Sequence, residues 1–257
     1  MAYDLSQENP LPLGQVAGDD GGMRTIGLIG GLSWYSTLEY YRVVNEEVQR
    51  RLGGHSSASV AMHSVDFSRV RACQESGEWA KAGRILGDAA RRCEAGGADF
   101  VLICSNLMHK VYDDVAAVVG VPVLHIADAV AADAQRLGLR QVGLLGARWV
   151  MEETFYTDRL ARHGIGVTLP GEQDRVMVDR VIFDELTQGR IEEGSRRRYV
   201  DIIAGLAADG AQAVVLACTE IQLLVGAGDC DLPLVDSMRS HAVRAVDLAL
   251  EEAVSLA

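Results

Sequence analysis

Two short polar clusters carry side chains that could move protons. The first is Cys104-Ser105-Asn106, followed by His109, and the second is Cys218-Thr219-Glu220. Each cluster directly follows a run of apolar residues that is typical of a buried strand. A cysteine thiol has an ordinary pKa of about 8.5, which is close enough to neutrality for acid–base work after modest tuning. Two such groups on opposite faces of one carbon could remove a proton from one side and return it on the other, as racemisation requires.

The two clusters belong to a longer internal repeat. The run RTIGLIGG recurs as RQVGLLGA, GADFVLICSN as GAQAVVLACT, and VPVLHIAD as LPLVDSMR. These runs start at 24 and 140, 97 and 210, and 121 and 232, which are separations of 116, 113 and 111 residues. In this register Ser105 corresponds to Cys218, and Cys104 corresponds to Ala217. Because neighbouring strand residues point to opposite faces, Ser105 is expected to face the way Cys218 does.

Each repeat reads as alternating strands and helices. Strands are expected at 24–30, 58–65, 99–104, 121–126, 140–145, 165–169, 212–217 and 232–235. Helices are expected at 36–52, 77–95, 150–163, 176–187, 193–209 and 239–253. The pattern predicts an α/β fold of two pseudo-symmetric, doubly wound (Rossmann-like) halves with parallel sheets.

Ligands of open parallel sheets bind beyond the carboxyl ends of the strands. Four polar loops lie at such ends, GGLSWYST at 30–37, CSNLMHK at 104–110, GARWVME at 146–152 and CTEI at 218–221. We therefore expect both halves to face a central cleft lined by these loops. The first half should comprise 23–123 plus 236–257, with the final helix packing back on it, and the second half 124–235. Residues 1–22 lack the features of a signal peptide and are interpreted as a flexible N-terminal tail.

Composition excludes several classes of function. The net charge of −12 disfavours nucleic acid and anionic membranes as partners. The chain has no apolar run long enough to span a bilayer. Five cysteines without a CxxC pair argue against a disulfide framework or a metal site, so the cytoplasm is the expected compartment. The run GLIGGLS lacks the third glycine of a dinucleotide loop, and no cofactor is expected.

Beyond these patterns, the chain resembles the aspartate/glutamate racemase family, and most of all its broad-specificity amino-acid racemases. The resemblance covers roughly residues 24 to 250. It rests on the blocks IGLIGGLSWYSTLEYY, RLGGHSSASVAMHSVDF, GEWAKAG, CSNLMHK, VPVLHIADA, MEETFY, IFDEL and ACTEI. It implies a PLP-independent enzyme with two similar halves and catalytic cysteines, acting on a small amino acid or a related carboxylic acid. Relatives are often dimers, so a homodimer is one expectation.

The resemblance also implies roles for individual residues. Cys218 matches a catalytic thiol, while the position of the first family cysteine is taken by Ser105. Cys104 would replace Ser105 only if the loop shifted its register. Residues interpreted as substrate-binding are Ser33, Asn106, Thr219, Glu220, His109 and Arg148. For most of these the alternative is structural: Ser33, Asn106 and Thr219 could cap helices, and His109 could be a buried histidine with satisfied hydrogen bonds.

Departures from the family pattern leave other activities open. Leu107 replaces a threonine, Thr187 stands nearest to where some aspartate racemases carry a lysine, and Trp149 hints at a bulkier substrate. Aspartate itself is therefore not favoured. A single thiol would also suit a decarboxylase or a cis–trans isomerase of a small dicarboxylic acid. A third hypothesis is a non-catalytic binding protein built on the same scaffold.

Overall fold

The computed structural model describes residues 22–251, and its eight strands form two parallel sheets of four. The first sheet has the order β2 (Val60–Ser64), β1 (Ile26–Gly30), β3 (Phe100–Ile103), β4 (Val123–Leu124). The second has the order β6 (Gly166–Thr168), β5 (Gln141–Gly146), β7 (Ala213–Ala217), β8 (Leu234–Asp236). The predicted α/β class and all eight predicted strands are confirmed. The tail predicted at 1–22 lies outside the described residues, apart from Gly22.

Strand register repeats between the two sheets. Ile26 of β1 pairs with Phe100 of β3, and Val142 of β5 pairs with Ala213 of β7. Val142 lies 116 residues after Ile26, and Ala213 lies 113 residues after Phe100, which are the separations found in the sequence repeat. Since β3 pairs with β1 in the same register as β7 pairs with β5, Ser105 and Cys218 occupy equivalent positions after β3 and β7.

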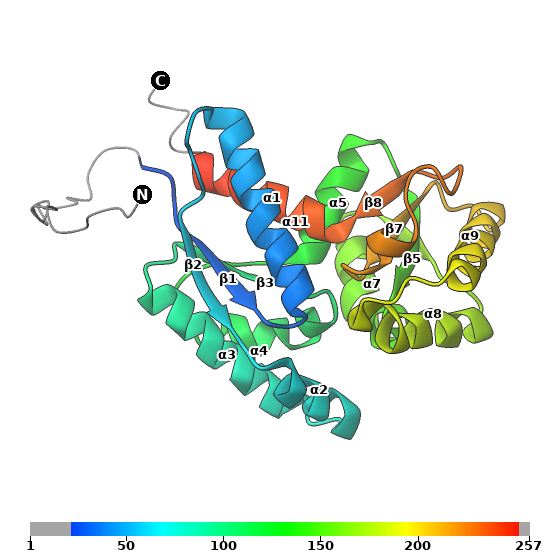
Figure 1. Ribbon diagram of the computed structural model, residues 1–257, viewed down its shortest axis with the longest axis horizontal. Coiled ribbons are helices and arrows are strands. Elements are labelled where there is room, and N and C mark those ends of the chain that lie inside the picture. The colour runs from blue at the N-terminus through cyan, green and yellow to red at the C-terminus, as the bar shows by residue number, and fades with distance from the viewer. Residues whose placement is uncertain (1–21, 252–257) are drawn as a thin grey trace, which may run out of the picture.

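Helices cover both faces of each sheet (Figure 1). On the first sheet, α1 (Trp34–Leu52) and α11 (Ser237–Leu250) pack on one face, and α2 (Phe67–Ser76), α3 (Trp79–Ala95), η1 (Leu107–Val111) and α4 (Tyr112–Ala116) lie on the other. On the second sheet, α5 (Ile126–Arg136) and α7 (Thr154–Arg162) face α8 (Glu172–Asp184) and α9 (Glu193–Ala208) across the strands. Three short helices complete the order, α6 (Arg148–Glu152), η2 (Leu186–Gln188) and α10 (Ile221–Leu224).

The chain crosses between the halves twice. After β4, the helix α5 packs into the core of the second sheet. After β8, the helix α11 returns to the first sheet, where its apolar face packs with residues of β1, β3 and α1 (Figure 1). The Asp236 carboxylate caps α11 by accepting hydrogen bonds from the backbone N–H groups of Met238 and Arg239, at 3.0 and 3.1 Å.

Helix boundaries differ from the prediction at several places, and α1 and α3 begin two residues from their expected starts, at Trp34 and Trp79. The single helix expected at 150–163 is two helices, because Glu153 adopts an extended backbone between α6 and α7 while its carboxylate pairs with Lys110. The helix expected at 176–187 begins earlier, at Glu172, and its last turn is the separate 3₁₀ helix η2. The final helix begins at Ser237, and the residues expected to continue it beyond 251 are not described. Within 22–251, no helix is long and apolar enough to cross a membrane.

Candidate active site

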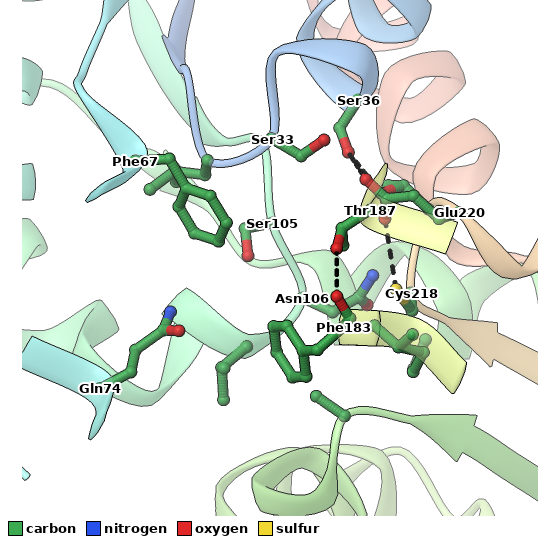
Figure 2. A pocket seen from close by; sticks show the side chains of 16 residues that line it. Ser33, Ser36, Phe67, Gln74, Ser105, Asn106, Phe183, Thr187, Cys218 and Glu220 are labelled. Carbon is green, nitrogen blue, oxygen red and sulfur yellow. Dashed lines mark hydrogen bonds between the residues drawn. The ribbon is translucent and has the colours of Figure 1, made fainter. Parts of the chain in front are cut away.

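A small cavity lies where the carboxyl ends of the two sheets meet (Figure 2). All four predicted loops contribute to it, together with side chains from α2, α8 and η2. Its lining consists of Leu32, Ser33, Ser36, Phe67, Gln74, Ser105, Asn106, Leu107, Ala147, Ile182, Phe183, Thr187, Ala217, Cys218, Thr219 and Glu220. The free volume of about 50 Å³ is far below the roughly 300–1,000 Å³ of typical ligand pockets. The cavity between the two halves is therefore narrow.

Cys218 brings a thiol to this cavity directly after β7. The side chain is half-buried, and its Sγ–H donates a hydrogen bond to Glu220 Oε2 at 3.2 Å. Burial, and after it the negative charge of Glu220, raises the pKa of Cys218 well above its ordinary value. At neutral pH Cys218 is therefore a thiol with a proton acceptor already in contact.

Ser105 brings a hydroxyl to the same cavity from the loop after β3. The side chain is half-buried, and its Oγ accepts a long hydrogen bond from the Met108 N–H, at 3.4 Å. Figure 2 shows Ser105 and Cys218 reaching the cavity from different loops. No basic side chain among the described residues contacts the Ser105 hydroxyl, so nothing there would ionise it.

Glu220 is the centre of a buried hydrogen-bond network. Its Oε2 accepts hydrogen bonds from Cys218 Sγ and from the Thr219 hydroxyl at 2.6 Å, and its Oε1 accepts one from the Ser36 hydroxyl at 3.1 Å. The Ser36 and Thr219 oxygens also lie within hydrogen-bond distance of each other, and because each hydroxyl carries one proton, only two of these three hydroxyl contacts can be hydrogen bonds at one time. Since Ser36 is on α1 of the first half, this network joins the two halves at the thiol.

Asn106 and His109 hold the Ser105 loop. Asn106 lines the cavity and is almost fully buried. His109 does not line it: the ring donates through Nδ1 to the Ser105 carbonyl at 2.8 Å and accepts at Nε2 from the Ile126 N–H at 3.1 Å. Burial lowers the pKa of His109 to about 4, so the ring is neutral and both nitrogens are occupied. These bonds place His109 behind the site as a structural residue, not as one that contacts substrate.

Ser33 lies at the cavity with an unusual backbone. Its φ of 126° makes it the one non-glycine residue with positive φ in the described part of the chain. Its carbonyl accepts hydrogen bonds from the Thr37 backbone N–H at 3.3 Å and from the Thr37 hydroxyl at 3.1 Å. The Ser33 side chain does not cap α1. Outliers of this kind often cluster at functional sites.

Besides His109, two of the predicted site residues lie away from the cavity, Arg148 and Cys104. Arg148 is exposed on α6 and pairs with Glu152 at 2.7 Å. Cys104 is fully buried in the core of the first sheet among residues of α1 and α11, and burial raises the pKa of its thiol. This position favours core packing for Cys104. No lysine or arginine is among the residues that line the cavity.

Several lining residues were not anticipated from the sequence. Ser36 looked like an ordinary residue at a helix start, and Phe67, Gln74, Ile182 and Phe183 come from helices whose cavity-facing side depends on packing. Gln74 is buried, yet its amide donates only to the weak acceptor Met108 Sδ, at 3.2 Å. The sequence carries no signal for this part of the site, because the burial of Gln74 is visible only in the folded structure.

Comparisons with known proteins bear on the family and the fold of the chain. The family described as Asp/Glu/Hydantoin racemase matches residues 29–245. A structure from Yersinia pestis, described as a candidate Asp/Glu racemase, is 45% identical with a TM-score of 0.84 and covers 89% of this chain and 100% of its own. An aspartate racemase homologue from Pyrococcus horikoshii is 32% identical with a TM-score of 0.76, covering 88% of this chain and 99% of its own. The glutamate racemase of Francisella tularensis shares the fold at 13% identity, with a TM-score of 0.60 and coverage of 89% and 81%.

Proposed function

Because this chain belongs to the Asp/Glu/hydantoin racemase family, we propose that it is a cofactor-independent racemase or epimerase acting at the Cα of an amino acid. The observation that carries the proposal is the pairing of Ser105 and Cys218. They follow equivalent strands of the two sheets and line one cavity. A substrate between them would present the two faces of its Cα to the two halves.

Cys218 would take the Cα proton after giving its own proton to Glu220. The Sγ–H···Oε2 hydrogen bond already points along this transfer. Ser36 and Thr219 donate to the same carboxylate and would adjust as it gains a proton. The thiolate formed in this way is the base. It becomes a thiol again when it takes the Cα proton, and Glu220 releases the proton that it holds to solvent.

Ser105 would return a proton on the opposite face of Cα. A serine hydroxyl is a very weak acid and base at neutral pH, so we place a water held by Ser105 in the relay. The proton given to Cα is then replaced from solvent before the next turnover. The substrate leaves with the same atoms and charge and with inverted configuration.

The substrate carboxylate would be held by Asn106, Thr219 and the first turn of α1. Ser33 and Ser36 belong to that turn and line the cavity, where the positive end of the helix dipole favours an anion. Donors aimed at this carboxylate would stabilise the negative charge that moves into it as the Cα proton leaves.

An amino acid with an uncharged side chain fits the rest of the cavity best. Phe67, Ile182 and Phe183 supply apolar surface, and Gln74 supplies a neutral amide. The lining contains no lysine or arginine to neutralise a second carboxylate, and the carboxyl group of Glu220 would repel one. The two lysines of the chain, Lys81 and Lys110, do not line the cavity either, so neither is placed to form a Schiff base with a PLP group there.

The test is incubation in heavy water with single enantiomers of a panel of amino acids, read by chiral chromatography and mass spectrometry. We expect deuterium at Cα in both enantiomers of an uncharged amino acid. Cys218→Ala should abolish both exchange and inversion, and Ser105→Ala should lower inversion by about 10²–10⁴-fold. Cys230→Ala is the matched control, since this half-buried thiol does not line the cavity and its loss should change neither rate.

One observation favours a second candidate function. Only one thiol lines the cavity within the described residues, which also suits one-sided proton delivery after decarboxylation of a small dicarboxylic acid. That reaction would release carbon dioxide and would survive Ser105→Ala but not Cys218→Ala. Carbon dioxide release without amino-acid inversion would therefore replace racemisation by decarboxylation. Tight ligand binding without any turnover, insensitive to alkylation of Cys218, would instead indicate a binding protein.

A further inference from the structure

A line of buried hydrogen bonds connects the Ser105 loop with the strand that carries Cys218. The Tyr156 hydroxyl donates to Asn106 Oδ1 at 3.1 Å, and Asn106 Nδ2 donates to the Ser237 hydroxyl at 3.0 Å. Ser237 donates in turn to the backbone carbonyl of Leu216 at 2.7 Å. Asn106 directly follows Ser105, and Leu216 lies two residues before Cys218. The two candidate proton-transfer groups are thus linked by side chains that belong to neither.

The atoms in this line have few alternative arrangements. Tyr156 and Ser237 are fully buried, and Asn106 is 4% exposed. The single hydroxyl proton of Ser237 goes to the Leu216 carbonyl, so the Ser237 oxygen must accept from the Asn106 amide. This assignment leaves Asn106 Oδ1 as the acceptor for Tyr156. Breaking one of these hydrogen bonds would leave a buried donor or acceptor without a partner, which costs free energy. The three bonds are therefore expected to form and break together.

The line crosses from one half of the molecule to the other. Asn106 belongs to the loop after β3 of the first sheet, whereas Tyr156 is on α7, in the core of the second sheet. Ser237 is the first residue of α11, where the chain leaves β8 and returns to the first half. At the other end of the loop, His109 ties the Ser105 carbonyl to Ile126, the first residue of α5 at the other crossover. The Ser105 loop is therefore anchored at both chain crossings.

We propose that Ser237 and Tyr156 are positioning residues that set the separation of Ser105 and Cys218. Neither lines the cavity, so they act on the substrate only through Asn106 and β7. The inference rests on the racemase function proposed above and adds a requirement to it. Inversion needs both proton-transfer groups aligned on one carbon, whereas exchange with retention needs only Cys218.

The ratio of inversion to exchange tests this inference. One enantiomer is incubated in heavy water, and deuterium in the recovered enantiomer is compared with formation of the opposite one. Because a misplacement of about 1 Å can cost about 10²-fold in rate, we expect Ser237→Ala and Tyr156→Phe to lower inversion by about 10–100-fold. Exchange with retention should change much less, so the ratio falls. Tyr156→Phe removes a single hydroxyl oxygen and serves if Ser237→Ala does not fold.

Ser240→Ala is the matched control on the same helix. Ser240 is also buried, but its hydroxyl donates to Asp133 at 2.6 Å, with the Asp236 carbonyl 3.0 Å away, and does not reach the Ser105 loop. Its loss should leave the ratio unchanged. If the ratio of inversion to exchange is unchanged in the Ser237 and Tyr156 variants, whether or not both rates fall, the positioning role is refuted and the proposed function is not. A wild-type protein that shows neither exchange nor inversion would refute the proposed function, and this inference with it.

Discussion

The strained backbone of Ser33 gives the most direct test of how the cavity is built. With φ and ψ of 126° and 123°, Ser33 occupies a region that non-glycine residues rarely adopt, which costs about 1–3 kcal/mol. The surroundings enforce it. Two hydrogen bonds from Thr37 hold the Ser33 carbonyl, and a Cβ at the preceding turn residue Gly31 would lie 2.0 Å from the Val65 carbonyl oxygen. The loop is therefore held at Gly31 by close packing and at Ser33 by the bonds to its carbonyl.

Ser33→Gly should stabilise the protein. It removes the strain but loses about 0.5–1 kcal/mol through the greater freedom of glycine in the unfolded chain, so a net gain of about 1 kcal/mol is expected. For a protein of this size that corresponds to a rise in Tm of about 3 °C. Ser33→Ala is the control, because it removes the hydroxyl and keeps the Cβ that causes the strain. Its free energy of unfolding should change by no more than about 0.5 kcal/mol.

Thermal and urea unfolding of the wild type, Ser33→Gly and Ser33→Ala measure the differences in stability. Racemisation rates of the same three proteins measure the effect on activity. Both variants lack the Ser33 hydroxyl, so both should racemise more slowly if that hydroxyl contacts the substrate. Ser33→Gly should lose more, because the loop is then free to leave the catalytic geometry. A glycine variant no more stable than the alanine variant would show that the backbone of Ser33 stores no strain, and the reasoning would fail.

The thiol, a buried imidazole and the core cysteine each give a further prediction. Glu220→Gln removes a charge that raises the pKa of Cys218. The rate of Cys218 alkylation, measured by peptide mass spectrometry, should therefore reach its half-maximal value at a lower pH. An unchanged midpoint would contradict the electrostatic interaction between Cys218 and Glu220. Burial lowers the pKa of His109 to about 4, so the unfolded chain binds more protons between about pH 6.5 and 4. As the pH is lowered through that window, the free energy of unfolding measured in urea should fall by up to about 3 kcal/mol. His109→Gln should remove this part of the dependence of stability on pH. An equally steep dependence in the variant would rule out His109 as its source. Cys104→Ala should lower the free energy of unfolding by about 1–2 kcal/mol without slowing racemisation; lost turnover in the folded variant would restore Cys104 as a catalytic candidate.

Much of the fold could be predicted because its signals are local. Buried parallel strands are short apolar runs closed by glycine or polar residues, and each such run became a strand. The separations of 116 and 113 residues even anticipated the register, since a strand pairing repeated in both halves must preserve its spacing. The break at Glu153 was missed because it accompanies an ion pair with Lys110, 43 residues away in the sequence.

Less of the site could be predicted because it depends on how helices pack. Arg148 was expected near the substrate on the basis of its loop, yet the first turn of α6 directs the side chain to Glu152 at the surface. Ser36 could not be connected with Glu220, since 184 residues separate them and their hydrogen bond exists only where α1 meets the loop after β7. The apolar wall formed by Phe67 and Phe183 likewise requires α2 and α8 to approach each other.

The internal repeat alone establishes that a serine stands in one half where a cysteine stands in the other, because the alternation of side chains along a strand decides which residues share a face. Tertiary structure decided what surrounds that cysteine. The proton acceptor at Glu220, the hydroxyl of Ser36 and the bonds from Asn106 through Ser237 to β7 depend on two sheets meeting at their carboxyl ends. The physical reason is range: strand and helix periodicity acts over a few residues, whereas a buried hydrogen bond needs partners that only the packed core brings within about 3 Å.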